Sequence, residues 1–138
     1  MLMRGANEDL VPLSRRLYEL FAKGDLPGIL PLLCPDVEWA EPENPFNPAA
    51  GVHRGHSGFL EWARIGNESE EILSLAPERF LQGEDCVAVV GESTCRVRRT
   101  GKTYTTAFVH LVQFRDGKVS SFREFFDTFA AAEAFKPD

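Results

Sequence analysis

The stretch TYTTAFVHLVQFRDGKVSSFREFFD, residues 103–127, decides the fold of this chain. It is rich in β-branched and aromatic residues on both sides of Asp116-Gly117, a dipeptide typical of tight hairpin turns. The stretch therefore predicts two antiparallel strands, at residues 103–114 and 119–127. The same kind of pattern predicts two earlier strands of one meander, at residues 71–82 and 86–98.

Upstream of this meander, apolar residues recur at the spacing of helices. A first helix is predicted to end at Gly24, and Asp25 is predicted to cap a short second helix that ends at Pro35. A third helix is predicted from Ser57 to Ile65, with a cap at His56 or Ser57. The first helix is predicted to start at one of the capping residues Asn7, Glu8 and Asp9.

The remaining segments complete the order of elements. A strand is predicted at residues 37–42, followed by a proline-rich loop (PENPFNPAAG, residues 42–51), and a turn of helix is predicted at 128–135. Because the helices come before an antiparallel meander, the chain is predicted to be a single α+β domain over residues 1–138.

Composition narrows the classes of function. The 138 residues carry a net charge of −6, which argues against a nucleic-acid partner. No apolar run is long enough to span a membrane, and the first ten residues have no signal-peptide core, so a cytoplasmic protein is expected. The cysteines Cys34, Cys86 and Cys95 form no C-x-x-C pair, so neither a disulfide framework nor a zinc site is expected.

Strand parity predicts which side chains face the core, because successive side chains point to opposite faces. Trp39 selects the inner face of its strand and brings Glu41 with it. His110 shares a face with Thr106 and Phe108. In residues 86–98 the inner set is Val87, Val89, Gly91, Ser93, Cys95 and Val97. In residues 119–127 parity leaves two faces open, one with Phe122, Glu124 and Phe126 and the other with Val119, Arg123, Phe125 and Asp127.

A set of short motifs, in order along the chain, resembles a known superfamily. The motifs are GDLPGI (24–29), DVEWAEP (36–42), GVHRGH (51–56), FRDGKV (114–119) and FREFFD (122–127). Their order and spacing resemble the nuclear transport factor 2-like superfamily, most closely its SnoaL-like, polyketide cyclase-like and ketosteroid isomerase-like proteins. The resemblance implies a cone-shaped, curved mixed or antiparallel sheet wrapped around N-terminal helices, as in cystatin-like folds. It also implies an apolar pocket at the open end and a homodimer formed through the outer sheet face.

The resemblance to ketosteroid isomerase implies roles for individual residues. The general base of that enzyme falls on Glu41, and its protonated oxyanion-hole aspartate falls on His110. Its oxyanion-hole tyrosine falls on Leu17, with Tyr18 next along the helix, so that tyrosine is missing and steroid isomerisation is not implied.

Comparison with limonene epoxide hydrolase resolves the open strand face. One catalytic aspartate of that enzyme falls on Glu124, which implies that Glu124 and its face-mates Phe122 and Phe126 point into the pocket. The enzyme's arginine and second aspartate fall near Ser93 and Cys95, and its water-activating tyrosine and asparagine match Trp39 and Glu41. Epoxide hydrolysis by that mechanism is therefore not implied.

These observations predict a site for a small, largely apolar or carbonyl-containing molecule, used without cofactor or metal. Glu41, His110 and Glu124 are predicted to carry acid/base chemistry of the isomerase, cyclase or dehydratase type. The predicted pocket lining is Leu17, Trp39, Ser93, Cys95, Phe108, Phe122 and Phe126.

Blander interpretations of the same residues stay open. Glu41, His110 and Glu124 could form a structural hydrogen-bond network, or orient a ligand without turning it over. The outer sheet face, with Arg123, Phe125 and Asp127, could instead be the functional surface of an interaction module. His53 and His56 read as loop residues rather than metal ligands, Trp62 as a core residue, and Cys95 as a buried thiol rather than a nucleophile.

Overall fold

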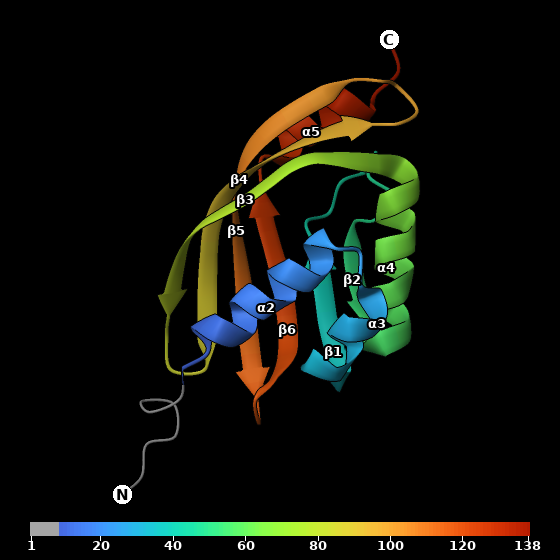
Figure 1. Ribbon diagram of the computed structural model, residues 1–138. Helices are drawn as coiled ribbons and strands as arrows, with labels where there is room; N and C mark the ends of the chain where they lie inside the picture. Colours follow the sequence, from blue (N-terminus) through green and yellow to red (C-terminus); the bar gives the residue numbers. More distant parts are fainter. Residues whose placement is uncertain (1–8) are drawn as a thin grey trace, which may run out of the picture.

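One sheet organises the chain, and a computed structural model describes it for residues 9–138 (Figure 1). The six strands lie in the order β2-β1-β6-β5-β4-β3. β1 and β6 run parallel, and every other neighbouring pair runs antiparallel. The strands are β1 (Leu33–Glu41), β2 (Gly51–Arg54), β3 (Glu70–Gln82), β4 (Cys86–Val97), β5 (Thr103–Arg115) and β6 (Lys118–Phe126). The predicted α+β meander and curved mixed sheet are confirmed.

The helices cover one side of this sheet. They are α2 (Val11–Ala22), α3 (Leu26–Ile29), the 3-10 turn η1 (Leu30–Leu32), α4 (Gly55–Ser69) and α5 (Thr128–Phe135). Figure 1 shows α2 lying across the concave side in front of β5 and β6, with α4 beside β1 and β2 and the long strands β3 and β4 arching over the top. No helix within residues 9–138 is long and apolar enough to cross a membrane.

Local signals explain where the first helices begin and end. The N-cap of α2 is Leu10, which has no side-chain cap, so the predicted start at Asp9 is wrong by one residue. Asp9 Oδ1 accepts a hydrogen bond from the Val11 amide, and Asn7 and Glu8 lie outside the described residues. Gly24 adopts a φ of +68°, as a residue that follows a helix often must, and Asp25 caps α3 by accepting from the Gly28 amide at 2.9 Å.

Four elements differ from the prediction. The second helix ends at Ile29 and continues only as the 3-10 turn η1, so its predicted end at Pro35 was wrong. β1 begins at Leu33 and contains Pro35, because its pairing with β6 shifts register between Leu33 and Glu38 and leaves room for a residue that cannot donate. β2 was not predicted, because four residues are too few to show alternation. α4 starts at Gly55 with no side-chain cap and continues to Ser69, so the predicted caps His56 and Ser57 and the end at Ile65 were wrong.

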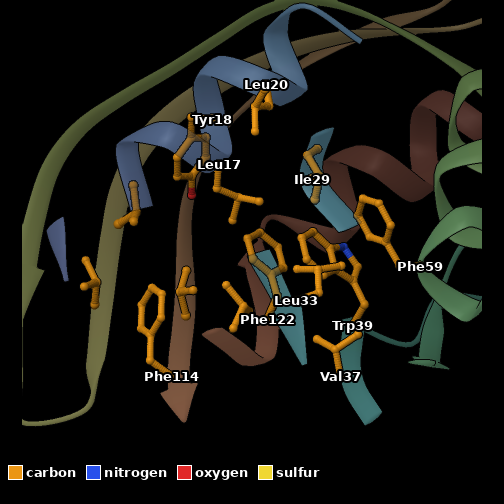
Figure 2. Packing of buried hydrophobic residues seen from close by; sticks show 14 of the residues in the cluster. Leu17, Tyr18, Leu20, Ile29, Leu33, Val37, Trp39, Phe59, Phe114 and Phe122 are labelled. Carbon is orange, nitrogen blue, oxygen red and sulfur yellow. The ribbon is translucent and has the colours of Figure 1, made fainter. Parts of the chain in front are cut away.

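The core confirms the inner faces that parity predicts. Trp39 stacks on Phe122 with the ring centroids 4.0 Å apart, and it packs edge to face against Phe59 with the centroids 4.7 Å apart (Figure 2). The Trp39 Nε1–H has no hydrogen-bond acceptor within the described residues, and Figure 2 shows this nitrogen on the side of Phe59.

The outer face differs from the prediction at two residues, Val119 and Asp127. Val119 is 2% exposed and belongs to the core, because the pairing of β5 with β6 shifts register between Gln113 and Phe114. Arg123 and Phe125 are exposed there, as expected. Asp127 lies beyond β6 and caps α5, accepting from the Ala130 amide at 3.0 Å. A short side chain that satisfies a helix end is no longer part of the sheet surface, so Asp127 drops out of that face.

Candidate active site

A cavity of about 630 Å³ lies between the concave sheet face, α2 and α4. This volume is within the range of small-molecule sites, roughly 300–1,000 Å³. The predicted site residues that line it are Leu17, Trp39, Glu41, Ser93, Cys95, His110, Phe122, Glu124 and Phe126. The sheet thus brings together side chains that parity and resemblance assigned to one face.

Phe108 is the exception among the predicted lining residues. Its ring is 2% exposed and stacks on His110 at 4.1 Å, behind the cavity wall. It fills the space over Gly91, where an added Cβ would lie 2.6 Å from the Phe108 ring. Phe108 therefore supports His110 from below and does not line the cavity.

Glu41 ends β1 with both carboxyl oxygens hydrogen-bonded. Trp62 of α4 donates Nε1–H to Oε1 at 2.7 Å, and Asn47 of the proline-rich loop donates Nδ2–H to Oε2 at 2.9 Å. Burial, reinforced by the nearby charge of Glu124, nevertheless raises the pKa of Glu41 to about 8. At neutral pH the group is therefore mainly a protonated acid, close to the pH at which it becomes a base.

Strand register explains why Glu41 and Glu124 interact. Ala40 of β1 pairs with Arg123 of the parallel strand β6, so the next residues of both strands, Glu41 and Glu124, point to the same face. Glu124 in turn pairs directly with His110 of β5.

A chain of hydrogen bonds runs from α2 to β6. The Tyr18 hydroxyl lies 2.6 Å from His110 Nδ1, and His110 Nε2 lies 2.7 Å from Glu124 Oε2. His110 is 4% exposed, while Glu124 faces the cavity. Burial and the charge of Glu124 raise the pKa of Tyr18, so its hydroxyl keeps its proton.

This chain has two proton arrangements with different chemistry. When His110 is neutral, Tyr18 donates to Nδ1, and Nε2–H donates to Glu124. When His110 is protonated, Nδ1–H donates to the Tyr18 oxygen, and the Tyr18 proton turns to another acceptor. Only the second arrangement offers a hydroxyl donor to a ligand.

A second polar pair lies in the cavity wall. Tyr104 of β5 donates its hydroxyl to Glu70 at the start of β3. Cys95 of β4, the register partner of Tyr104, is 8% exposed, and burial raises the pKa of its thiol to about 12. The thiol therefore stays protonated at neutral pH, which supports the buried-thiol interpretation over a nucleophile.

The two histidines of the H-x-x-H motif serve the backbone. His53 Nε2 bonds the Ala49 carbonyl at 2.8 Å, and His56 Nε2 bonds the Leu33 carbonyl at 3.1 Å. Their neighbour Arg54 forms an ion pair with Glu38. Among residues 9–138, no group of three or more His, Cys, Asp or Glu side chains is arranged to hold a metal ion.

Sequence reasoning missed several residues of the site. Tyr18 is one residue after Leu17, the position implied by the resemblance, and its place on α2 directs its side chain into the cavity. Trp62 fits a helical core stripe as well as it fits a donor to a carboxylate. No sequence signal connects Asn47, in an irregular loop, with Glu41. The remaining missed pair is Glu70 and Tyr104.

Comparison with known proteins places the chain in a family. A model of the SnoaL-like domain matches residues 14–122. An uncharacterized protein of Mycobacterium tuberculosis is 30% identical over 133 residues, which are 94% of this chain and 95% of that protein.

Solved structures agree with this match. A nuclear transport factor 2-like protein from Burkholderia xenovorans is similar with a TM-score of 0.83 and 32% identity over 99% of both chains. TerC, co-crystallized with polyporic acid, is similar with a TM-score of 0.72 and 34% identity over 86% of this chain and 92% of TerC. The chain therefore belongs to the SnoaL-like family of the nuclear transport factor 2-like superfamily.

Proposed function

We propose that this protein catalyses cofactor-free proton transfer next to the carbonyl group of a small, largely apolar molecule bound in the cavity. The observation that carries the proposal is Glu41, a buried carboxyl group with a pKa of about 8 beside the Tyr18–His110–Glu124 chain. An acid/base group is most effective when its pKa lies near the working pH.

The proposed step balances without an external reactant. The Glu41 carboxylate removes a proton from the carbon next to the carbonyl, and the electron pair moves to the carbonyl oxygen to give an enolate. Glu41 then returns the proton to a different carbon, which isomerises the substrate. If the enolate instead expels a hydroxyl group from the neighbouring carbon, and this group leaves as water with the proton held by Glu41, the reaction is a dehydration. If the enolate carbon attacks a second carbonyl, whose oxygen takes that proton, the reaction is a cyclisation.

The hydrogen-bond chain stabilises the enolate oxygen. With His110 protonated and paired with Glu124, Nδ1–H donates to Tyr18, and the Tyr18 hydroxyl donates to the enolate. The Tyr18 hydroxyl and the His110 ring are held in place before the substrate arrives, so only the Tyr18 proton has to turn toward the enolate oxygen. The relative TerC, co-crystallized with polyporic acid, supports a small organic ligand in this cavity.

Deuterium exchange tests the proposal directly. β-Tetralone in D2O exchanges the protons next to its carbonyl, and NMR follows the rate with and without protein. We expect the wild-type protein to accelerate exchange and Glu41→Gln to reduce the acceleration by about 10²- to 10⁴-fold, the usual worth of a general base. Glu124→Gln should also reduce it, because His110 loses its anionic partner.

Glu68→Gln is the matched control for these carboxyl variants. Glu68 pairs with Arg64 on the exposed side of α4 and does not line the cavity. Exchange that is unchanged in both Glu41→Gln and Glu124→Gln would exclude acid/base catalysis by these residues.

Ligand binding without turnover is the second candidate function. It is favoured by one observation: both oxygens of Glu41 and both ring nitrogens of His110 already have protein partners. Binding of β-tetralone in calorimetry without accelerated exchange in wild type would support this function over catalysis.

A further inference from the structure

Glu70 and Tyr104 form a polar centre in the cavity that the proposed proton transfer does not use. Tyr104 donates its hydroxyl to Glu70 Oε1, and both residues line the cavity. Tyr104 lies six residues before His110 on β5, so the two point to the same strand face at different ends of it. The charge of Glu70 contributes to the raised pKa of Glu41, which indicates that both centres belong to one electrostatic environment.

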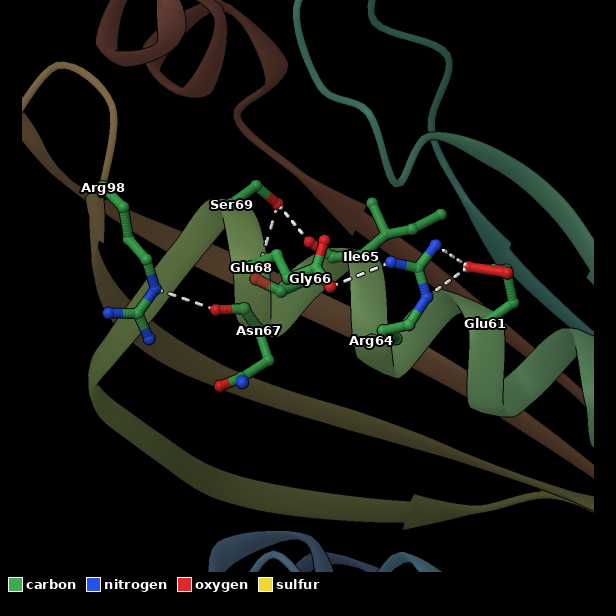
Figure 3. A network of polar contacts seen from close by, with 8 residues as sticks. All are labelled: Glu61, Arg64, Ile65, Gly66, Asn67, Glu68, Ser69 and Arg98. Carbon is green, nitrogen blue, oxygen red and sulfur yellow. Dashed lines mark hydrogen bonds and ion pairs between the residues drawn. The ribbon is translucent and has the colours of Figure 1, made fainter.

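The backbone that carries Glu70 is held in place. Figure 3 shows the end of α4, where Arg98 Nε donates to the Asn67 carbonyl at 2.8 Å and the Ser69 hydroxyl donates to carbonyls of the preceding turn. The Arg98 amide also donates to the Ser69 carbonyl at 3.0 Å, next to Glu70. The junction between α4 and β3 is thereby fixed to Arg98, the residue after β4, and the Glu70 carboxyl is held by the Tyr104 hydroxyl.

The pair presents acceptors to the cavity and no donor. The Tyr104 proton is committed to Glu70, and burial together with the Glu70 charge raises the pKa of Tyr104 so that it stays protonated. Within residues 9–138 no Lys or Arg forms an ion pair with Glu70. A partly buried carboxylate without a cationic partner gains from any donor that reaches it.

We propose that Glu70 and Tyr104 form a specificity site that accepts a hydrogen bond from a hydroxyl group at the end of the substrate remote from its carbonyl. The assignment of the carbonyl to the other end rests on the proposed function.

The surroundings favour a neutral hydroxyl over charged groups. Burial raises the pKa of Glu70, while the hydrogen bond from Tyr104 favours its carboxylate, which would repel an anionic group. A cationic group would meet Arg64 and Arg98, which line the same cavity. The cavity wall between the two centres includes Trp62 and Phe126, which suit a flat, unsaturated framework. The substrate class that fits is therefore a ring compound with a ketone at one end and a phenolic or enolic hydroxyl at the other.

Calorimetric binding of matched probes tests this inference without requiring turnover. The probes are two hydroxyketones of different length, 6-hydroxy-β-tetralone and 4-(4-hydroxyphenyl)cyclohexanone, each compared with its methyl ether. A hydroxyl bonded to a buried carboxylate is worth about tenfold in affinity, which a methyl ether cannot provide. We expect wild type to prefer the hydroxyl form of at least one pair by that factor.

Variants of the cavity residues show which side chains cause the preference for the hydroxyl probe over its methyl ether. Glu70→Gln should reduce the hydroxyl preference to near one while leaving the affinity for the methyl ether within about twofold, which also shows that the variant is folded. Tyr104→Phe should keep the preference, because it removes only the donor that competes for the Glu70 carboxyl. Tyr18→Phe should weaken both members of a pair equally and keep the preference. Glu68→Gln should change neither.

Two results would overturn the inference. The first is a wild-type protein that binds each hydroxyketone no more tightly than its methyl ether. The second is a preference that survives Glu70→Gln and is lost in Tyr18→Phe, which would assign the hydroxyl to the other centre. Proton exchange on β-tetralone is independent of both results, so failure here is distinguishable from failure of the proposed function.

Discussion

At the scale of single residues, the site depends on a conflict at Glu41. Burial and Glu124 disfavour its carboxylate, while Trp62 and Asn47 hold the same carboxylate with two hydrogen bonds. Burial has the larger effect, so the pKa of Glu41 rises to about 8 and does not fall below its ordinary value. A carboxyl group that is paired only with neutral donors can exchange a proton near neutral pH, whereas one paired with an arginine could not.

The raised pKa of Glu41 predicts a pH dependence of stability. Its pKa is about 8 in the folded protein against the ordinary 4.5 when unfolded. The folded state therefore binds the proton more tightly, and this contribution is complete below pH 4.5 and lost as pH rises to about 8. The loss amounts to up to about 4–5 kcal/mol.

Urea unfolding of wild type and Glu41→Gln between pH 5 and pH 9 measures this contribution. We expect the stability of wild type relative to Glu41→Gln to decrease steadily across the interval. A constant difference between the two proteins would mean that Glu41 titrates at its ordinary pKa.

At the scale of elements, the close contact between β3, β4 and β5 sets the position of His110. Gly91 of β4 has no side chain, so Phe108 of β5 fills that space and supports the His110 ring. An added Cβ at Gly91 would also lie 2.3 Å from the Ala76 carbonyl oxygen, a backbone atom that cannot move aside easily.

Gly91→Ala is therefore expected to destabilise the protein by about 1–3 kcal/mol, the usual cost of overpacking. Gly66→Ala is the matched control, because an added Cβ there meets nothing within 4 Å and alanine favours a helix. Thermal unfolding should give a lower Tm than wild type for Gly91→Ala and a higher Tm for Gly66→Ala. Equal or higher stability of Gly91→Ala would refute the packing argument.

The elements also show which features a sequence can predict. Alternation in residues 103–127 predicts both long strands and which side chains share a face, because side-chain period is a local property. It does not say which face of residues 119–127 is the inner one, which only the family resemblance implied. Trp62 and Asn47 could not be assigned to Glu41, because their meeting depends on how α4 and an irregular loop pack against β1. Resemblance to known enzymes led to Glu41, His110 and Glu124, and their roles stay predictions.

At the scale of the whole molecule, the outer sheet face carries an uncovered apolar surface. Val109 and Phe125 are register partners on β5 and β6, and they are 37% and 48% exposed. Leu81 on β3 is 47% exposed. An exposed apolar pair such as Val109 and Phe125 is typical of a sheet face that another surface covers.

We propose that a second copy of the chain covers this face, as the family resemblance implies. Analytical ultracentrifugation at micromolar concentration should give a dimer for wild type and a monomer for Val109→Glu, because a buried unpaired charge opposes association. Val52→Glu, an exposed residue on the edge strand β2, is the control and should remain dimeric. A monomeric wild type would leave the face available to a different partner.

The position of Trp39 and Trp62 has a practical consequence. These are the chain's 2 tryptophans, and both line the cavity. Trp62 is hydrogen-bonded to Glu41, and the ring centroids of Trp39 and Trp62 are 5.2 Å apart. All of the indole emission therefore originates at the cavity, so its intensity and wavelength should respond to an occupant and to the ionisation of Glu41, with no label added and no background signal from elsewhere in the protein.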